Sequence, residues 1–390
     1  MSAARTKRIV LAAGGTGGHM FPAQALAAEL LQRGYRPVLI TDKRGGGFGP
    51  ELSDQVETYR IAAAGFAGGD IMAKVKSLLS LGIGYLQARR LLKRLQPEAV
   101  VGFGGYAALP TVMAAAHRHL RVILHEQNAV LGRTNRLLAS KADIVATSFP
   151  EVRGLREADR DKAVLTGNPV RGQIAALGRK PYAVANAHGH LRLLVTGGSQ
   201  GARVFNDLVP RAVALLPEPL RRRLMISQQV RGTDLEAVRQ AYQGTHVQVE
   251  LQSFFEDLPD RLKSAHLVIC RSGASTVTEL STAGRPAILV PYPFAADDHQ
   301  TANAQAFAKG GGGWVMPQST LTPEALAERL NEVLSDTATL TGAANAARAF
   351  GQPDSAARLA DLVTGVHRTN GDEKGHGHAN GNRNGKEAAA

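Results

Sequence analysis

The chain has 390 residues, of which 44% are hydrophobic and 5% aromatic, with a net charge of +13 and one cysteine, Cys270. A chain of this length is too long to fold around a single compact core, so we expect two domains. The composition favours an α/β protein over an aromatic-rich β-sandwich. An internal disulfide is excluded, no stretch is apolar enough to span a bilayer, and no signal peptide is evident, so we expect a cytoplasmic protein.

The positive charge is concentrated in the first half of the chain. Residues 1–166 hold 23 Lys/Arg against 13 Asp/Glu, whereas residues 167–390 hold 23 against 20. A basic surface suits nucleic acid, but neither an RNA- or DNA-binding module nor an aromatic stacking platform accompanies it. We therefore expect no nucleic-acid partner, and instead an anionic membrane surface or a phosphorylated substrate.

Short apolar strands alternate with helical segments along the chain. The first half predicts an amphipathic helix over 20–33 and strands at 7–13, 36–42, 98–103, 120–125 and 143–147. The rhythm restarts in the second half, with strands at 191–196, 223–227, 246–251, 266–270 and 287–291. Such βαβ alternation predicts parallel sheets that are covered on both faces.

The segment Thr166-Gly167-Asn168-Pro169-Val170-Arg171 separates the halves, and its Asn-Pro step favours a turn or an extended hinge. We therefore predict two doubly wound Rossmann-like domains that face each other across a cleft, 1–166 and 167–350. Residues 351–366 are expected to form a C-terminal helix that returns to the N-terminal domain. Residues 367–390 are rich in Gly, Asn, His and Ala and predict a disordered tail without a role in function.

Three glycine clusters follow expected strands: GGTGGH at 14–19, GFGGY at 102–106 and GGSQGA at 197–202. Glycines let backbone N–H groups approach an anion closely, and a following helix start adds the positive end of its dipole. The clusters therefore predict phosphate binding in both halves.

The first cluster also suggests a nicotinamide site, because Asp42 ends the second strand where a ribose-binding acid is expected. Met20, however, occupies the position of the third glycine in that fingerprint. His19 at the end of the loop either caps the start of the helix or acts as a base or hydrogen-bond donor in the cleft.

Four further segments follow apolar strands, where open α/β sheets place ligand contacts. In one of them, Ser272-Gly273 turns the chain into a helix that begins near Ala274, whose free N–H groups suit a diphosphate. Glu279 lies more than one turn into that helix, where it either accepts hydrogen bonds from ribose hydroxyls or acts as an ordinary capping acid. The segments are 125–128 (HEQN), 167–171 (GNPVR), 271–279 (RSGASTVTE) and 298–304 (DHQTANA).

Taken together, seven segments resemble the MurG family, the peripheral membrane N-acetylglucosaminyltransferases that convert lipid I to lipid II in bacterial peptidoglycan synthesis. The resemblance covers about residues 7–365 in order. The matching segments are GGTGGHMFPA, GFGGY, LHEQNAVLGRTNR, TGNPVR, GGSQGARVFN, CRSGASTVTEL and DDHQTANA.

The resemblance implies a GT-B fold, with the donor UDP-N-acetylglucosamine in the C-terminal domain and the lipid-linked acceptor in the N-terminal domain. It implies an inverting transfer of N-acetylglucosamine to the C4 hydroxyl of the muramyl sugar of lipid I. It places the enzyme at the cytoplasmic face of the inner membrane as a peripheral protein, and it suggests other cell-wall and division proteins as partners. No cofactor is expected, and a divalent metal would at most stimulate; the pair Asp297 and Asp298 is not expected to bind one.

The resemblance also assigns roles to residues. His19 is the expected base that takes the C4 hydroxyl proton, with Glu126 in reserve. Donor binding is assigned to Thr16, Gly17 and Gly18 of the first loop, Asn128 of the acceptor-side HEQN segment, Arg171 and Ser199 at the diphosphate, Phe255 at uracil, Ala274, Ser275, Thr276, Val277, Thr278 and Glu279 at phosphate and ribose, and Gln300 at the sugar hydroxyls.

The acceptor and the membrane have their own expected residues. Segment 71–81 interleaves apolar and basic residues and is followed by Arg89-Arg90 and Lys93-Arg94, which suits an anionic leaflet. Leu78, Leu79, Leu91 and Leu92 alternatively form the core-facing stripes of ordinary helices. The residues assigned to acceptor or membrane are Gly104, Gly105, Tyr106, Ile71, Val75 and Leu79.

Three other functions remain open from the residues themselves. A UDP-sugar epimerase would share the fold and the nucleotide site, but would need acid and base carboxylates around the sugar. A nicotinamide dehydrogenase would need a dinucleotide on the first loop. A protein that only binds anionic lipid or nucleic acid would release no UDP.

Overall fold

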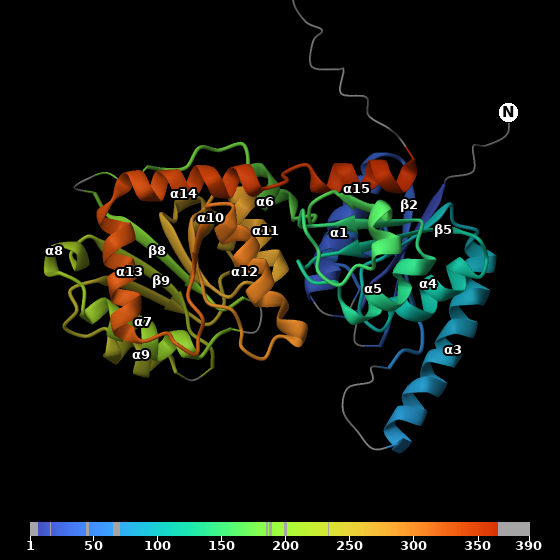
Figure 1. Cartoon of the computed structure of the whole chain (residues 1–390), viewed down its shortest axis with the longest axis horizontal. Coiled ribbons are helices and arrows are strands. Elements are labelled where there is room, and N and C mark those ends of the chain that lie inside the picture. The colour runs from blue at the N-terminus through green and yellow to red at the C-terminus, as the bar shows by residue number, and fades with distance from the viewer. Residues whose placement is uncertain are drawn as a thin grey trace, which may run out of the picture.

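The computed structural model describes residues 7–15, 17–43, 47–64, 71–184, 186, 189–198, 201–232 and 234–365. These residues form two α/β domains that lie side by side (Figure 1). The two parallel sheets agree with the GT-B fold that the resemblance implied.

The N-terminal domain is built on a parallel sheet with the strand order β3-β2-β1-β4-β5-β6-β7. Buried runs of Ile, Val, Leu and Ala form its central strands, as expected when helices cover both faces. The strands are β1 (Arg8–Ala12), β2 (Arg36–Thr41), β3 (Glu57–Arg60), β4 (Ala99–Gly102), β5 (Arg121–Glu126), β6 (Ile144–Thr147) and β7 (Ala163–Leu165). The helices are α1 (Gly17–Gln32), α2 (Pro50–Ser53), α3 (Ile71–Leu95), α4 (Ala108–Ala116) and α5 (Arg133–Leu138), with 3-10 turns η1 (Ala139–Lys141) and η2 (Glu157–Lys162).

The C-terminal domain repeats this architecture with the strand order β10-β9-β8-β11-β12-β13, again all parallel. Its strands are β8 (Leu191–Thr196), β9 (Leu224–Gln229), β10 (Gln248–Gln252), β11 (Leu267–Cys270), β12 (Ala287–Leu289) and β13 (Gly313–Val315). Its helices are α6 (Gly172–Leu177), α7 (Val204–Ala214), α8 (Glu218–Arg221), α9 (Leu235–Ala241), α10 (Leu258–Ser264), α11 (Ala274–Ala283), α12 (His299–Lys309), α13 (Pro323–Ser335) and α14 (Thr337–Phe350), with the 3-10 turn η3 (Ala296–Asp298).

In both sheets the strand order reverses direction at one point, between β1 and β4 and between β8 and β11. Ligands of open α/β sheets bind outside the carboxyl ends of the strands at such a switch point. The glycine cluster at 14–19 follows β1 and the cluster at 102–106 follows β4, while the cluster at 197–202 follows β8. The topology therefore brings these loops to the edge where a ligand is expected.

The chain crosses between the domains twice. It passes through the segment 166–171, and it returns after α14 to place α15 (Ser355–Thr364) against α1 (Figure 1). Leu359, Ala360 and Val363 of α15 join the N-terminal core, and Asp361 pairs with Arg33 at 2.6 Å. The C-terminal helix α15 therefore packs as part of the N-terminal domain.

The two crossings touch each other at Gly167, which has a φ of +81°. A Cβ at this position would lie 2.5 Å from the Cβ of Gln352, so both the backbone angle and the close approach require glycine. Ser355 Oγ donates to the carbonyl of Asn168 at 3.0 Å. The hinge is thus a packed junction of two chain segments.

The sequence prediction omitted β3, β7 and β13, and it started the first helix three residues late. All three omitted strands lie at an edge of a sheet, and β7 is exposed throughout, so they lack the buried apolar run that identifies a central strand. Helix α1 begins at Gly17, with Pro22 inside it. Gly17 and Gly18 therefore belong to the first turn of the helix.

Candidate active site

The loops after β1 and β4 pack tightly against each other and around His19. Gly104 and Gly105 have φ angles of +89° and +73°. A Cβ on Gly104 would lie 3.2 Å from His19 Cε1, and one on Gly105 would lie 3.1 Å from the Cα of Gly14. Glycine at these positions therefore lets the imidazole of His19 lie directly on the second loop.

The His19 ring is half-buried at the start of α1. Its Nδ1 lies 3.1 Å from Oε1 of Gln127. Burial lowers the pKa of His19 below its usual value, while the hydrogen bond to Gln127, the nearby carboxylate of Glu126 and the carbonyl of Phe103 partly offset the effect. A neutral imidazole is therefore favoured at neutral pH, which is the form that accepts a proton.

Glu126 is buried at the end of β5, and its carboxylate holds the following loop together. Its Oε1 accepts from the backbone N–H of Asn128 at 3.0 Å, and its Oε2 accepts from Gly132 N at 2.8 Å and Asn135 Nδ2 at 2.9 Å. The carboxylate therefore fixes the backbone of the loop 126–135, which forms one wall of the cleft.

A cavity of about 270 Å³ lies between the domains. The N-terminal domain contributes His19, Gly104, Gly105, Tyr106, Glu126, Gln127, Asn128 and the loop 130–135, and the C-terminal domain contributes Ala296, Asp297 and His299. The structure thus brings the expected catalytic and acceptor residues together in one cavity. Gly17 and Gly18 start the helix beside it, whereas Thr16 lies outside the described residues.

Two contacts join the walls of this cavity across the domains. Asn303 of α12 is fully buried: its Oδ1 accepts from Ala129 N at 2.8 Å, and its Nδ2 donates to Asn128 Oδ1 at 3.1 Å and to the Ser272 carbonyl at 3.0 Å. Asp297 pairs with Arg133 of α5. The sequence pattern indicates no role for Asn303 or Arg133, although both lie in segments that match the family, because nothing in a segment shows that it faces the other domain.

The third glycine loop, after β8, starts with a turn that only glycine allows. A Cβ on Gly197 would lie 2.1 Å from the backbone N of Ala202. The Gly197 N–H donates to Gln229 Oε1 at 3.2 Å, and Thr196 Oγ1 donates to the same oxygen at 2.9 Å. Ser199 lies outside the described residues.

Helix α11 starts where predicted, at Ala274, with Gly273 extended before it. Ser275 and Thr276 are half-buried near the helix start, whereas Val277 and Thr278 face the core. Thr278 donates to the Ala274 carbonyl at 2.8 Å. Within the predicted run Ala274–Glu279, the first turn is therefore the part with backbone N–H groups for an anion.

Arg171 at the hinge and Glu279 of α11 form an ion pair, with 3.3 Å between Arg171 Nη2 and Glu279 Oε1. Burial raises the pKa of Glu279, and Arg171 partly offsets this effect. The guanidinium of Arg171 also lies over the ring of Phe21, 5.5 Å from its centroid. The pair therefore places the expected diphosphate and ribose contacts side by side.

Gln300 ties the loop before α12 to the start of α11. Its Oε1 accepts from Tyr292 N at 2.9 Å and from Ser272 N at 3.3 Å. Asp297 and Asp298, just before it, have φ angles of +53° and +51°, which are strained for residues with a side chain. The amide of Gln300 thus holds the loop that faces the N-terminal domain.

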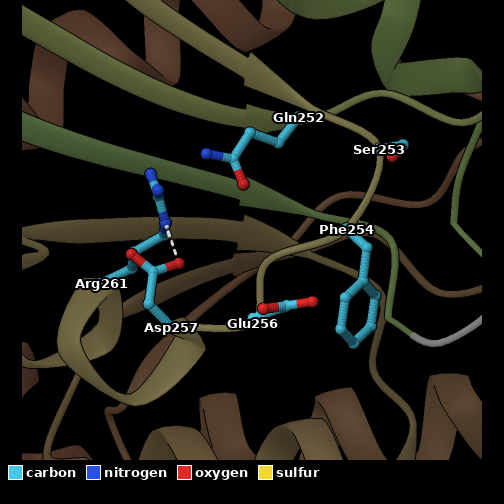
Figure 2. A pocket seen from close by; sticks show the side chains of 6 residues that line it. All are labelled: Gln252, Ser253, Phe254, Glu256, Asp257 and Arg261. Carbon is cyan, nitrogen blue, oxygen red and sulfur yellow. Dashed lines mark hydrogen bonds and ion pairs between the residues drawn. The ribbon is translucent and has the colours of Figure 1, made fainter.

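Phe255 is buried after β10, and the guanidinium of Arg261 lies 4.2 Å from its ring centroid. A cavity of about 460 Å³ opens beside this loop. Figure 2 shows Phe254 and Glu256 on the loop, and Asp257 bonded to Arg261 of α10. The expected uracil contact through the backbone of Phe255 therefore lies next to an open cavity at the end of the strand.

Helix α3 projects from the N-terminal domain (Figure 1). Met72, Val75, Leu78, Leu79, Ile83 and Leu86 are exposed along it. The alternative that Leu78 and Leu79 face the core is wrong, since they are 64% and 62% exposed, whereas Leu92 is buried. The side chain of Ile71 lies outside the described part of the chain. None of the helices in the described part combines the length and apolar character that crossing a bilayer requires.

Among the described residues, no group of three or more His, Cys, Asp or Glu side chains is arranged to hold a metal ion. Asp297 has Arg133 and Arg136 as neighbours, at 3.3 and 3.9 Å. The expectation that no metal or other cofactor is required stays a prediction.

Comparison with known proteins identifies the family. Residues 9–147 match the glycosyltransferase family 28 N-terminal domain, and residues 192–359 match its C-terminal domain. The chain is 58% identical to the UDP-N-acetylglucosamine–N-acetylmuramyl-(pentapeptide) pyrophosphoryl-undecaprenol N-acetylglucosamine transferase of Rhodospirillum centenum, over 92% of this chain and 94% of the relative. It is 54% identical to the protein of the same name from Paramagnetospirillum magneticum, over 92% and 96%.

A solved structure of MurG from Acinetobacter baumannii superimposes with a TM-score of 0.75 at 34% identity, covering 92% of this chain and all of that one. Sequence, domain composition and fold agree. The chain therefore belongs to the MurG family of glycosyltransferases.

Proposed function

We propose that this protein transfers N-acetylglucosamine from UDP-N-acetylglucosamine to the C4 hydroxyl of the muramyl sugar of lipid I, with inversion at the anomeric carbon, to give lipid II. The names of its relatives support the donor and the acceptor. The observation that carries the proposal is the interdomain cavity, where His19 of one domain faces the strained loop before α12 of the other.

His19 is the proposed base. Its pKa is lowered by burial, so the neutral ring accepts the proton of the attacking hydroxyl, a contribution typically worth ~10²–10⁴-fold. Glu126 is less suited to the role, because both of its carboxylate oxygens already accept hydrogen bonds from the loop 128–135. We therefore assign Glu126 to holding the acceptor wall.

The leaving UDP needs positive charge at its diphosphate. Arg171, the Ser199 loop and the start of α11 are proposed to supply it, with Glu279 accepting hydrogen bonds from the ribose. Uracil is proposed to lie against the backbone of Phe255, and the sugar hydroxyls near Gln300 and Asn128. No step in this scheme requires a cofactor, and a divalent cation would at most stimulate it.

The acceptor is lipid-linked, so the protein is proposed to work on the cytoplasmic face of the inner membrane as a peripheral protein. The exposed stripe of α3 (Met72, Val75, Leu78, Leu79, Ile83 and Leu86) and its neighbouring Lys and Arg residues support contact with an anionic leaflet. Other cell-wall and division proteins remain proposed partners on the strength of the family alone.

The test is UDP release from UDP-N-acetylglucosamine with and without a lipid I analogue. We expect release to depend on the acceptor, His19→Gln to lose turnover while still binding the donor, and Glu279→Gln to weaken donor binding. An enzyme that binds the donor but transfers nothing to any lipid-linked muramyl acceptor would contradict the proposal and favour an epimerase or a nucleotide-regulated binding protein.

A further inference from the structure

A chain of hydrogen bonds connects His19 to the hinge between the domains. His19 Nδ1 lies 3.1 Å from Gln127 Oε1, and Gln127 Nε2 lies 2.9 Å from both the Nδ1 and the backbone carbonyl of His125. His125 Nε2 then lies 3.1 Å from the carbonyl of Gly167. Gln127 and His125 are both buried, so water does not compete freely for these bonds.

The protons along this chain follow from the two backbone carbonyls that it contacts, those of Gly167 and His125, because a carbonyl oxygen only accepts. The Gly167 carbonyl requires a proton on His125 Nε2. Burial lowers the pKa of His125 to about 4, so at neutral pH this ring is neutral and its Nδ1 is an acceptor. The amide of Gln127 supplies the donor, and the same Nε2 also donates to the His125 carbonyl.

The orientation of the Gln127 amide is therefore set by His125, and its oxygen must face His19. An amide oxygen cannot donate, so His19 Nδ1 carries the proton that bridges them. A neutral imidazole has one N–H, and the lone pair consequently resides on His19 Nε2. His19 lines the interdomain cavity, so its ring is within reach of a hydroxyl bound there.

We propose that Gln127 is a positioning residue, which holds His19 in the Nδ1–H tautomer and so reserves Nε2 as the base. The proposal rests on the proposed function for the identity of the substrate. As the acceptor O4 bonds to the anomeric carbon, its proton moves to His19 Nε2. The bond from that carbon to the diphosphate oxygen breaks, and UDP leaves with the electron pair. Gln127 Oε1 then accepts from the Nδ1–H of the resulting imidazolium.

Other titratable groups also surround His19. Glu126 raises its pKa, and His299, which faces it from the C-terminal domain, lowers it. His125 is coupled to it through the shared amide of Gln127. The backbone carbonyl of Phe103 is a further hydrogen-bond acceptor for this ring, and Gln127 is the side chain that bonds to Nδ1.

The experiment observes the tautomer directly, by nitrogen NMR of the full chain labelled in its histidine rings, with the His19 signals assigned through their loss in His19→Gln. In the native protein we expect a protonated Nδ1 and an unprotonated Nε2. Gln127→Met removes the acceptor and should move protonation toward Nε2. Gln127→Glu loses the bonds that Gln127 Nε2 makes to His125 but keeps an oxygen that faces His19 Nδ1, so it should retain the native tautomer of His19. Gln55→Met, the same change at an exposed glutamine of this domain, is the matched control.

Activity provides the second readout. Gln127→Met should reduce kcat/KM at least about 10-fold, and by no more than the ~10²–10⁴-fold that a general base contributes. Gln127→Glu should restore part of the lost kcat/KM. Because the bond to Gln127 raises the pKa of His19, its loss should move the acidic limb of the pH profile to lower pH.

A native His19 protonated at Nε2 would overturn the proposal, and so would an unchanged tautomer and pH profile in Gln127→Met. If Gln127→Met does not fold, the native spectrum still tests the tautomer of His19, and loss of that tautomer in Gln127→Glu would overturn the proposal. The NMR result needs no substrate. Absence of UDP release from the native enzyme would therefore refute the proposed function separately.

Discussion

Asp297 of the C-terminal domain forms an ion pair with Arg133 of the N-terminal domain, with 3.3 Å between Asp297 Oδ1 and Arg133 Nη2. Both residues line the interdomain cavity that also contains His19. Asp297 holds a left-handed backbone angle of +53° there. A strained residue that pairs across a domain interface is suited to fix how closely the domains approach.

We expect Arg133→Ala to raise the KM for the acceptor several-fold and to leave the melting temperature unchanged, because the pair is exposed and contributes little to folding. Asp297→Ala should do the same. Steady-state kinetics of the single and double variants test this, since two residues that act as one pair give a double variant no worse than either single one. Strictly additive losses would contradict the pairing.

The buried carboxylate of Glu279 should lower the stability of the fold and strengthen binding of the donor. Burial raises the pKa of Glu279, so the folded state binds a proton more readily than the unfolded chain. The free energy of unfolding therefore falls as the pH rises from the unfolded pKa of this carboxyl through its folded pKa. Glu279→Gln removes that cost at neutral pH, and Arg171, which is 41% exposed, remains hydrated. We expect a higher melting temperature together with a donor KM raised about 10- to 100-fold, from the loss of a charged hydrogen bond. A lower melting temperature would show that the pair stabilises the fold.

His125 predicts a specific loss of stability in acid. Burial lowers its pKa to about 4 in the folded protein, whereas the unfolded chain keeps a value near 6.5. The contribution of His125 to the free energy of unfolding is complete above the unfolded pKa. About 3 kcal/mol of it is lost as the pH falls from about 6.5 to about 4. Urea denaturation at several pH values should show this slope reduced in His125→Gln and unchanged in His190→Gln, which alters an exposed histidine.

The central strands and the phosphate loops could be predicted from the sequence because their signals are local. A buried strand is a short apolar run, and a loop that approaches an anion needs glycine at fixed positions. Edge strands carry neither signal: β7 is exposed along its whole length. Its existence depends on pairing with β6, which a local pattern does not encode.

The walls of the cavity depend on residues far apart in the sequence. Asn303 bonds to Ala129 across 174 positions, and Arg133 meets Asp297 across 164. Matched segments identified the neighbourhood of each of these residues, yet not its partner. Glu126 illustrates the difference, since its segment suggested a reserve base and its contacts indicate an anchor for the loop 126–135.

Arg285 predicts a structural weak point away from the cavity. It is almost completely buried, and its guanidinium donates to the carbonyls of Leu262 and Lys263 at the end of α10 and of Ala283 and Gly284 at the end of α11. Arg285→Lys keeps the charge but cannot span both helix ends, so we expect a loss of about 2–3 kcal/mol in the free energy of unfolding. Urea denaturation checks this, with exposed Arg222→Lys as the near-neutral control.

The exposed stripe of α3 leads to a prediction about membrane binding. Replacing Leu78 and Leu79 by Glu removes apolar side chains that are already exposed, so the melting temperature should not change. Full burial of a leucine is worth about 1.5–3 kcal/mol, so even partial insertion of two predicts binding to vesicles of anionic lipid weakened about 10- to 100-fold. Leu215→Glu, at an exposed leucine of the C-terminal domain, is the matched control.

Vesicle sedimentation measures this binding, and raising the salt concentration should weaken it further, because Lys74, Lys76 and their basic neighbours act through screened charges. Turnover of a soluble acceptor should stay at the native level in the double variant, since the described residues that line the interdomain cavity all lie outside α3. If the double variant binds vesicles as tightly as the native protein, another surface contacts the membrane. The basic residues of the N-terminal domain would then attract anionic lipid without the apolar stripe of α3.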